Sequence, residues 1–224
     1  MITPTAANVL RTFREATAED VTSGRAWYQR DHDAAREVAD QYGTDVTVVA
    51  AVYAVISPSM PWSRNDFLAR EAFRLAAEGA SFDDIVAGLG MMKANARKAA
   101  AIVLGADPAT VVSGPKVTPF WQRIVDAASG ATGPGSVVVD RHAFAVAGGR
   151  VTDDRTRGTF LGRKGGTHAV AMAYVRAASV LRRTGEAPGI TPSELQAVTW
   201  TTWRREHAHA MGRAEARRDA QRAA

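Results

Sequence analysis

Apolar residues recur mostly at intervals of three and four along this chain, which is the spacing of one face of an α-helix. Glycine and capping residues (Ser, Thr and Asp) punctuate these stretches where helices should begin and end. The pattern predicts an all-α protein of about nine or ten helices, packed as one domain over 1–224 with a basic, frayed tail over 206–224. The predicted helices cover 25–42, 45–56, 63–77, 81–88, 93–104, a short turn after Asp107-Pro108, 117–128, 140–148, 167–184 and a segment from Thr191 onward.

The segment from Asp45 to Ile56 is apolar at nearly every position. Its valines would also suit a strand, but Ala50, Ala51 and Ala54 interleave with them and favour a buried central helix. Ser57-Pro58 is expected to end that helix, because the residue before a proline is biased away from helical geometry.

Two segments in the second half of the chain carry clear signals. Arg150 to Gly166 is polar, basic and contains glycine, so we expect a surface loop there. Thr191-Pro192-Ser193-Glu194 combines a proline at the first helical position with a Thr-x-x-Glu capping box. This combination predicts the start of the last helix.

The run from Val137 to Val146 contains the most informative acid of the chain. Three valines lead to Asp140, and helical apolar spacing begins directly after it. Asp is a good N-cap, because its carboxylate accepts hydrogen bonds from the first amides of a helix. The positive end of the helix also favours the ionised form. The sequence therefore predicts an ionised carboxylate at a helix N-terminus, suited to stabilising a sugar cation or orienting water.

Composition excludes several classes of site. The chain has 224 residues and no cysteine, so disulfides, zinc–thiolate sites and iron–sulfur clusters are excluded. Its five histidines show no HExxH-type spacing, and we expect neither a metal nor a cofactor. We see no signal peptide at the first residues, and the longest apolar run is too short for a bilayer. These features predict a cytoplasmic protein without a membrane partner.

Positive charge is concentrated after Asp140. The formal net charge is +5, yet residues 1–112 hold 11 basic and 14 acidic residues, whereas residues 141–183 hold 9 basic and 2 acidic ones. A localised basic surface suits phosphate backbones. It is equally compatible with a solvated surface that only promotes solubility.

Three segments follow one another in a familiar order. They are Val55-Ile56-Ser57-Pro58-Ser59-Met60-Pro61-Trp62, Gly88-Leu89-Gly90-Met91-Met92-Lys93-Ala94-Asn95-Ala96-Arg97-Lys98-Ala99 and Val138-Val139-Asp140-Arg141-His142-Ala143-Phe144. They resemble the LLSAQ-type, GLY-x-x-KA-x-x-I and VDTH-x-x-R motifs of the helix–hairpin–helix DNA glycosylases, the superfamily with the endonuclease-III-like (HhH-GPD) fold. The resemblance covers roughly residues 45 to 205.

The chain departs from that family at the hairpin. Val111-Val112-Ser113-Gly114-Pro115-Lys116-Val117-Thr118 stands where the family has LPGVGRKTA, so the hairpin is shortened and degenerate. A hairpin that offers amides to a phosphate needs glycine geometry, and only part of it remains. The grip on DNA would then depend more on arginines. The turn also resembles phage- and actinobacterium-associated relatives.

The resemblance assigns chemistry to two residues. Asp140 would stabilise the oxocarbenium-like sugar and orient water, although an N-cap without a catalytic role explains the same residue. Lys116 aligns with the lysine that bifunctional members use as an amine nucleophile for AP-lyase chemistry. A phosphate contact or an ordinary surface lysine is the alternative.

Other residues are candidates for contacts with a flipped base and with double-stranded DNA. An aromatic side chain at Trp62 could stack on the base, and nearby polar groups could read its edge. The alternatives are core packing for the aromatic residues and helix capping, the more common role, for the polar ones. We expect His142 to make a structural hydrogen bond. The candidate base pocket is Trp62, Ser57, Ser59, Asn65 and Tyr28. The candidate backbone contacts are Arg141, Arg150, Arg155, Arg157, Arg163, Lys164 and Gly114.

The resemblance therefore implies a monomeric DNA glycosylase that flips a modified base and leaves an abasic site. Removal of glucosylated hydroxymethylcytosine from phage DNA, as an antiviral activity, is one specific form of this hypothesis. One alternative keeps the fold and modifies thymine substituents in phage DNA. A second alternative is a non-catalytic DNA-binding module in which Asp140 is only a helix cap.

Overall fold

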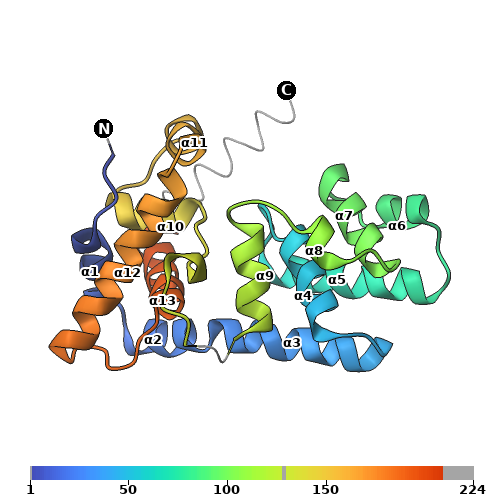
Figure 1. Cartoon of the computed structure of the whole chain (residues 1–224), viewed down its shortest axis with the longest axis horizontal. Helices are drawn as coiled ribbons and strands as arrows, with labels where there is room; N and C mark the ends of the chain where they lie inside the picture. The colour runs from blue at the N-terminus through green and yellow to red at the C-terminus, as the bar shows by residue number, and fades with distance from the viewer. Residues whose placement is uncertain (1, 128–129, 209–224) are drawn as a thin grey trace. The chain divides into compact units, whose positions relative to one another are not determined.

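The computed structural model describes residues 2–127 and 130–208, and these residues form helices without any strand (Figure 1). Thirteen α-helices and one short 3₁₀-helix are present in these ranges. The all-α prediction is confirmed. The predicted number of nine or ten helices is wrong, because three further segments are helical. Apart from residues 206–208, the tail predicted to fray lies outside the described residues.

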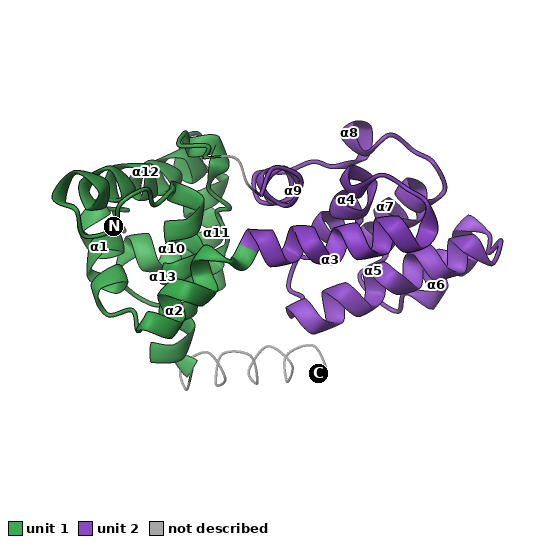
Figure 2. Ribbon diagram, turned by 90° about the horizontal axis from the view of Figure 1, so that it is seen from below, with its two compact units in different colours: residues 1–27, 130–224 green, residues 28–129 purple. Residues whose placement is uncertain are grey.

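The chain divides into two compact units (Figure 2). Unit 1 contains residues 1–27 and 130–224, and unit 2 contains residues 28–129. Unit 1 is thus built from both ends of the chain, and unit 2 is the segment inserted between them. The single domain expected over 1–224 stays a prediction, since one domain can contain two compact units.

Unit 2 is organised around the central helix that the sequence predicted. Helix α4 is buried from Val49 to Ile56 and packs against α5, α7, α8 and α9. Asp45 caps it by accepting a hydrogen bond from the Thr47 amide at 2.6 Å. The helices assigned to this part of the chain are α3 (Trp27–Tyr42), α4 (Val46–Ile56), α5 (Trp62–Ala77), α6 (Phe82–Gly88), α7 (Lys93–Val103), α8 (Pro108–Val111) and α9 (Val117–Val125).

Unit 1 packs its helices around a separate core. Phe144, Tyr174 and Leu181 are fully buried in that core. The Thr191 hydroxyl and the Glu194 carboxylate form the predicted capping box at the start of the last helix. The elements of this unit are α1 (Ala6–Arg14), α2 (Ala18–Arg25), η1 (Pro134–Ser136), α10 (Arg141–Gly148), α11 (Asp154–Gly162), α12 (Gly166–Thr184) and α13 (Pro192–Glu206).

Residues 150–166 contain a helix, so the predicted surface loop is wrong. Asp153 caps α11 by accepting a hydrogen bond from the Thr156 amide at 2.7 Å. Phe160, in the last turn, is buried in the core of unit 1. One buried aromatic residue and a good cap are therefore enough to hold this polar segment helical.

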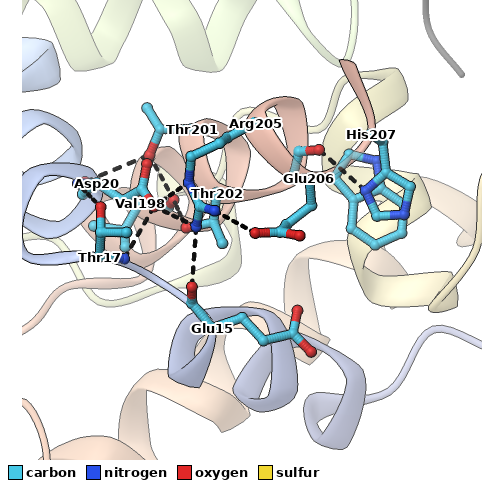
Figure 3. A network of polar contacts seen from close by, with 10 residues as sticks. Glu15, Thr17, Asp20, Val198, Thr201, Thr202, Arg205, Glu206 and His207 are labelled. Atoms are coloured by element: carbon cyan, nitrogen blue, oxygen red, sulfur yellow. Dashed lines mark hydrogen bonds and ion pairs between the residues drawn. The ribbon is translucent and has the colours of Figure 1, made fainter. Parts of the chain in front are cut away.

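A polar network joins α2 to the end of α13 (Figure 3). The buried Asp20 carboxylate accepts hydrogen bonds from Arg205 Nε and Nη2 at 3.1 and 2.9 Å and from the Thr17 amide at 3.0 Å. Arg205 also donates to the Glu15 carbonyl at 3.0 Å. Burial by itself would raise the pKa of Asp20, but the hydrogen bonds from Thr17 and Arg205 lower it below its ordinary value. Asp20 is therefore an ionised carboxylate in the folded protein.

We expect the Asp20→Asn variant to be about 2 kcal/mol less stable at neutral pH, the usual value of a hydrogen bond to a charged group. Because the folded-state pKa is lowered, the contribution is complete above the ordinary pKa of 3.8 and disappears as the pH falls through the lower folded value. Urea unfolding of both proteins from neutral pH to below 3.8 measures the difference. Asp153→Asn is the reference for an exposed cap. Hydrogen bonds from Thr156 also lower the pKa of the Asp153 carboxylate, but it has no arginine partner among the described residues, so its pH-dependent loss should be smaller. A difference independent of pH would contradict this account.

Candidate functional site

Asp140 is the N-cap of α10, as the sequence predicted, and its backbone is extended with φ −108° and ψ −171°. One carboxylate oxygen, Oδ1, accepts hydrogen bonds from the His142 and Ala143 amides at 2.9 and 2.8 Å. The other oxygen, Oδ2, makes no hydrogen bond with any residue in the described ranges, and the side chain is half-buried. The buried valines 137–139 fix the approach to this position. The helix thus holds one oxygen and leaves the second available to a ligand.

A buried tyrosine from another helix lies close to this carboxylate. The Tyr174 hydroxyl donates to the Ala143 carbonyl at 3.2 Å, and the side chain is fully buried. Burial raises the pKa of Tyr174 and the negative charge of Asp140 raises it further, while a hydrogen bond with Thr199 opposes them. Tyr174 is therefore a neutral donor that ties α12 to the first turn of α10.

His142, the second residue after Asp140, belongs to a group of packed rings. Arg141 Nε donates to His142 Nε2 at 3.1 Å, which confirms the predicted structural hydrogen bond of His142. The imidazole packs edge-on against Trp200 with ring centres 5.7 Å apart, and Trp27 packs against the same indole at 4.8 Å. The Arg204 guanidinium lies over the Trp200 ring at 4.7 Å. The Arg141 side chain is thus tied to His142, which packs against Trp200.

The other predicted backbone contacts of unit 1 lie on α11 or next to its ends. Arg150, Arg155, Arg163 and Lys164 are exposed. Arg157 is half-buried and pairs with Asp154 at 2.9 Å, so part of its charge is compensated. Of these cations, Arg155 and Arg157 lie within α11, and Arg163 is its C-cap.

In unit 2 the fold brings Lys116 to the predicted pocket loop. Lys116 Nζ donates to the Ser57 carbonyl at 3.4 Å, across 59 positions of sequence. Ser57 is the C-cap of α4, and its hydroxyl donates to the Ala54 carbonyl at 2.9 Å. Lys116 is therefore placed at the C-terminal end of α4, where the helix dipole is negative.

Tyr53, which the sequence did not indicate as a site residue, supports the aromatic side chain of this loop. Trp62 stacks on Tyr53 with ring centres 5.2 Å apart, and the Tyr53 hydroxyl donates to Asp66. Asn65 Nδ2 donates to the Tyr53 carbonyl at 3.2 Å, while the buried Asn65 Oδ1 has no hydrogen bond with the described residues. The signal for Tyr53 was its position in the buried helix before the loop.

The remaining pocket candidates are placed differently. Tyr28 is buried and packs edge-on against Phe120, with ring centres 6.4 Å apart. Ser59 is exposed, with a positive φ of 61°. Gly114 is exposed at φ +109°, a backbone conformation that favours glycine, in the turn before α9. Asp140 belongs to unit 1 and Lys116 to unit 2, so neither unit alone contains both predicted catalytic residues.

Two further findings concern the described ranges alone. No group of three or more His, Cys, Asp or Glu side chains that could hold a metal ion occurs within residues 2–127 and 130–208. None of the helices in those ranges is long and apolar enough to cross a bilayer.

The fold and the site define an all-α protein with a half-buried N-cap carboxylate and with exposed cations on or beside α11 in the same unit. The chain belongs to the family described as a family of unknown function, DUF7178, whose model matches residues 2–207. No curated protein and no solved structure matches the chain.

Proposed function

We propose that this protein is a DNA glycosylase with a degenerate helix–hairpin–helix fold. The observation that carries the proposal is the Asp140 carboxylate, with Oδ1 fixed by two amides and Oδ2 without a hydrogen bond to any described residue. A carboxylate that is held in place and has one available oxygen is suited to hydrolysis of an N-glycosidic bond. The exposed cations of α11 support a ligand with a phosphate backbone.

In the proposed reaction a nucleotide leaves the duplex and its N-glycosidic bond breaks, with the electron pair departing on the base. The sugar then carries positive charge over C1′ and the ring oxygen. Asp140 stabilises that charge and orients a water molecule, whose oxygen bonds to C1′. The proton released by water neutralises the departing base, so the products are a free base and an abasic site.

The proposed substrate is double-stranded DNA that carries a bulky modified base, such as glucosylated hydroxymethylcytosine in phage DNA. The setting would be antiviral defence by a monomeric cytoplasmic enzyme that uses no metal or cofactor. The degenerate hairpin turn around Gly114 supports a role outside routine repair, because it retains only part of the usual phosphate-binding geometry.

The experiment that tests this function uses duplexes that each contain one defined modified base. Incubation with the full chain, followed by hot alkali, should produce a strand break at one modified position. A mass change of the DNA without a break would support thymine modification instead. Salt-sensitive binding without either product would support a non-catalytic DNA-binding module.

We expect the enzyme to be monofunctional, because Lys116 Nζ donates a hydrogen bond to the Ser57 carbonyl at the end of α4 and is held there by that contact. Borohydride should therefore trap no covalent adduct between the protein and DNA that contains an abasic site. Lys98→Ala is the matched control, since Lys98 Nζ donates to Ser113 in the same turn, at 3.0 Å. An adduct that forms with this control and is absent from Lys116→Ala would contradict the expectation.

A further inference from the structure

Arg163, at the end of α11, is an exposed cation of unit 1 that is held by an aromatic ring. Its guanidinium carbon lies 3.8 Å from the centre of the Phe160 ring. Its side chain is exposed and makes no ion pair or hydrogen bond with any residue of the described ranges. A ring attracts a guanidinium through its π-face without neutralising the charge. Arg163 is therefore held in place while its N–H groups remain available.

The backbone around Arg163 is also fixed. The Gly166 amide donates to the Arg163 carbonyl at 3.0 Å and closes the turn between α11 and α12. A Cβ atom at position 166 would lie only 2.0 Å from the Phe160 carbonyl oxygen, so glycine permits the close approach of the two helices. The end of α11 is thereby locked against the start of α12.

The Phe160 ring connects this position to the helix that begins after Asp140. Phe160 packs against Phe144 with ring centres 5.0 Å apart, and Phe144 is a fully buried residue of α10. The Arg163 guanidinium contacts the Phe160 ring, and that ring contacts Phe144 in the core of unit 1. The position of Arg163 relative to Asp140 is consequently set by core packing.

Among the other exposed cations of this unit, Arg204 also lies over a ring, but its guanidinium carbon is 4.7 Å from the centre of Trp200 rather than 3.8 Å. Four further cations lack at least one of the two properties. Arg14 and Arg205 pair with the carboxylates of Glu186 and Asp20, each at 2.9 Å. The side chains of Arg155 and Lys164 are exposed and form no ion pair with the described residues, but no ring holds them. A phosphate must order such a flexible side chain on binding, which costs conformational entropy.

We propose that Arg163, seated on Phe160, is the principal phosphate contact of unit 1. The inference rests on the proposed function only in that DNA is the ligand. Its planar fork can bind two oxygens of one phosphate, and the ring restricts the guanidinium to a small range of orientations. Phe160 is a positioning residue in this account, since it acts on the ligand only through Arg163.

The test is binding of the full chain to a short unmodified duplex at salt concentrations from about 50 to 200 mM. We expect Arg163→Ala to weaken binding about 3- to 10-fold and to reduce the salt slope by about 0.9, the value of one lost phosphate contact. Arg155→Ala, an exposed arginine of the same helix without a ring contact, should weaken binding less than about 2-fold.

Two conservative variants separate the effect of the guanidinium–ring contact from the effect of the positive charge at Arg163. Arg163→Lys keeps the charge and Phe160→Leu keeps an apolar side chain, yet each removes the guanidinium–ring contact. Both should lose most of the affinity that Arg163→Ala loses, and combining Phe160→Leu with Arg163→Ala should add little. Thermal unfolding shows whether Phe160→Leu remains folded. If Phe160→Leu does not fold, the affinity of Arg163→Lys alone tests whether the guanidinium–ring contact matters.

The outcomes are distinguishable. Equal affinity of Arg163→Ala and Arg155→Ala, with the wild type binding DNA, overturns this inference and leaves the glycosylase proposal standing. Failure of the wild type to bind DNA overturns both. If the variants lose DNA affinity as expected but the wild type forms no abasic product, this inference is supported and the glycosylase proposal is not.

Discussion

The Asp140→Asn variant is expected to release the target base about 100- to 1,000-fold more slowly than the wild type, the effect of removing one preorganised electrostatic group. The Asn side chain keeps an oxygen that can accept from the His142 and Ala143 amides, now at 2.9 and 2.8 Å. It carries no charge, so it cannot offset the positive charge that develops on the sugar. The difference is measured as single-turnover rates of base release from a modified duplex that the wild type uses as a substrate.

The stability of Asp140→Asn distinguishes a catalytic role of Asp140 from a role as a helix cap. Asn and Asp are equally good N-caps, so the free energy of unfolding should change by less than about 1 kcal/mol. Asp153→Asn makes the same chemical change at the N-cap of α11 in the same unit and should retain full activity. If Asp140→Asn and Asp153→Asn were equally active, Asp140 would be a cap only.

The Gly24→Ala variant is expected to lose about 3 kcal/mol of stability, at the upper end of the cost of overpacking. Gly24 is buried where α2 crosses α13, and an added Cβ would lie 2.4 Å from Val198 Cα and 2.5 Å from Val198 N. Backbone atoms cannot rotate away as a side chain can, so the two helices must separate. For a chain of this size the midpoint of thermal unfolding should fall by roughly 6–12 °C.

Gly158→Ala is the matched control for that substitution. Gly158 lies inside α11, its φ is not positive, and a Cβ atom there would meet no atom within 4 Å. Alanine has a higher helix propensity than glycine, so this variant should be about 0.5–1 kcal/mol more stable than the wild type. Equal unfolding temperatures for the two variants would show that α2 does not pack on α13 as described.

Helices that combine a capping residue with a strong apolar run could be predicted from the sequence. Asp45 before α4 and Thr191 before α13 both cap the helices that were expected after them. The predicted start of a helix at Ser63 was less accurate, since α5 begins at Trp62 directly after Pro61. Local chemistry determines such starts to within a residue or two.

Two of the three helices that were missed, α2 and α11, have weak local signals. Helix α2 begins with a capping box in which Asp20 takes the position of the usual Glu, and its sequence is mostly polar. Helix α11 contains Gly158 and many charged residues, so its propensity for helix is low. Packing against the rest of unit 1 stabilises them, and that packing depends on contacts between residues far apart in sequence.

In the candidate site, too, some features follow from neighbouring residues and others depend on tertiary contacts. The capping role of Asp140 followed from the residues beside it and is confirmed. The contact between Lys116 and Ser57, the donor Tyr174 near Asp140 and the seat of Arg163 on Phe160 required the tertiary structure. These contacts join different helices or depend on where a helix ends, and the apolar pattern contains no information on either.

Mass spectrometry of the small molecules released from modified phage DNA tests the central claim most directly. Incubation of the wild-type chain with DNA that contains glucosylated hydroxymethylcytosine should yield the free modified base and an equal amount of abasic sites, and Asp140→Asn should yield neither at the same time. Release of an intact nucleotide, or no release from any modified DNA at protein concentrations that saturate binding, would contradict the account.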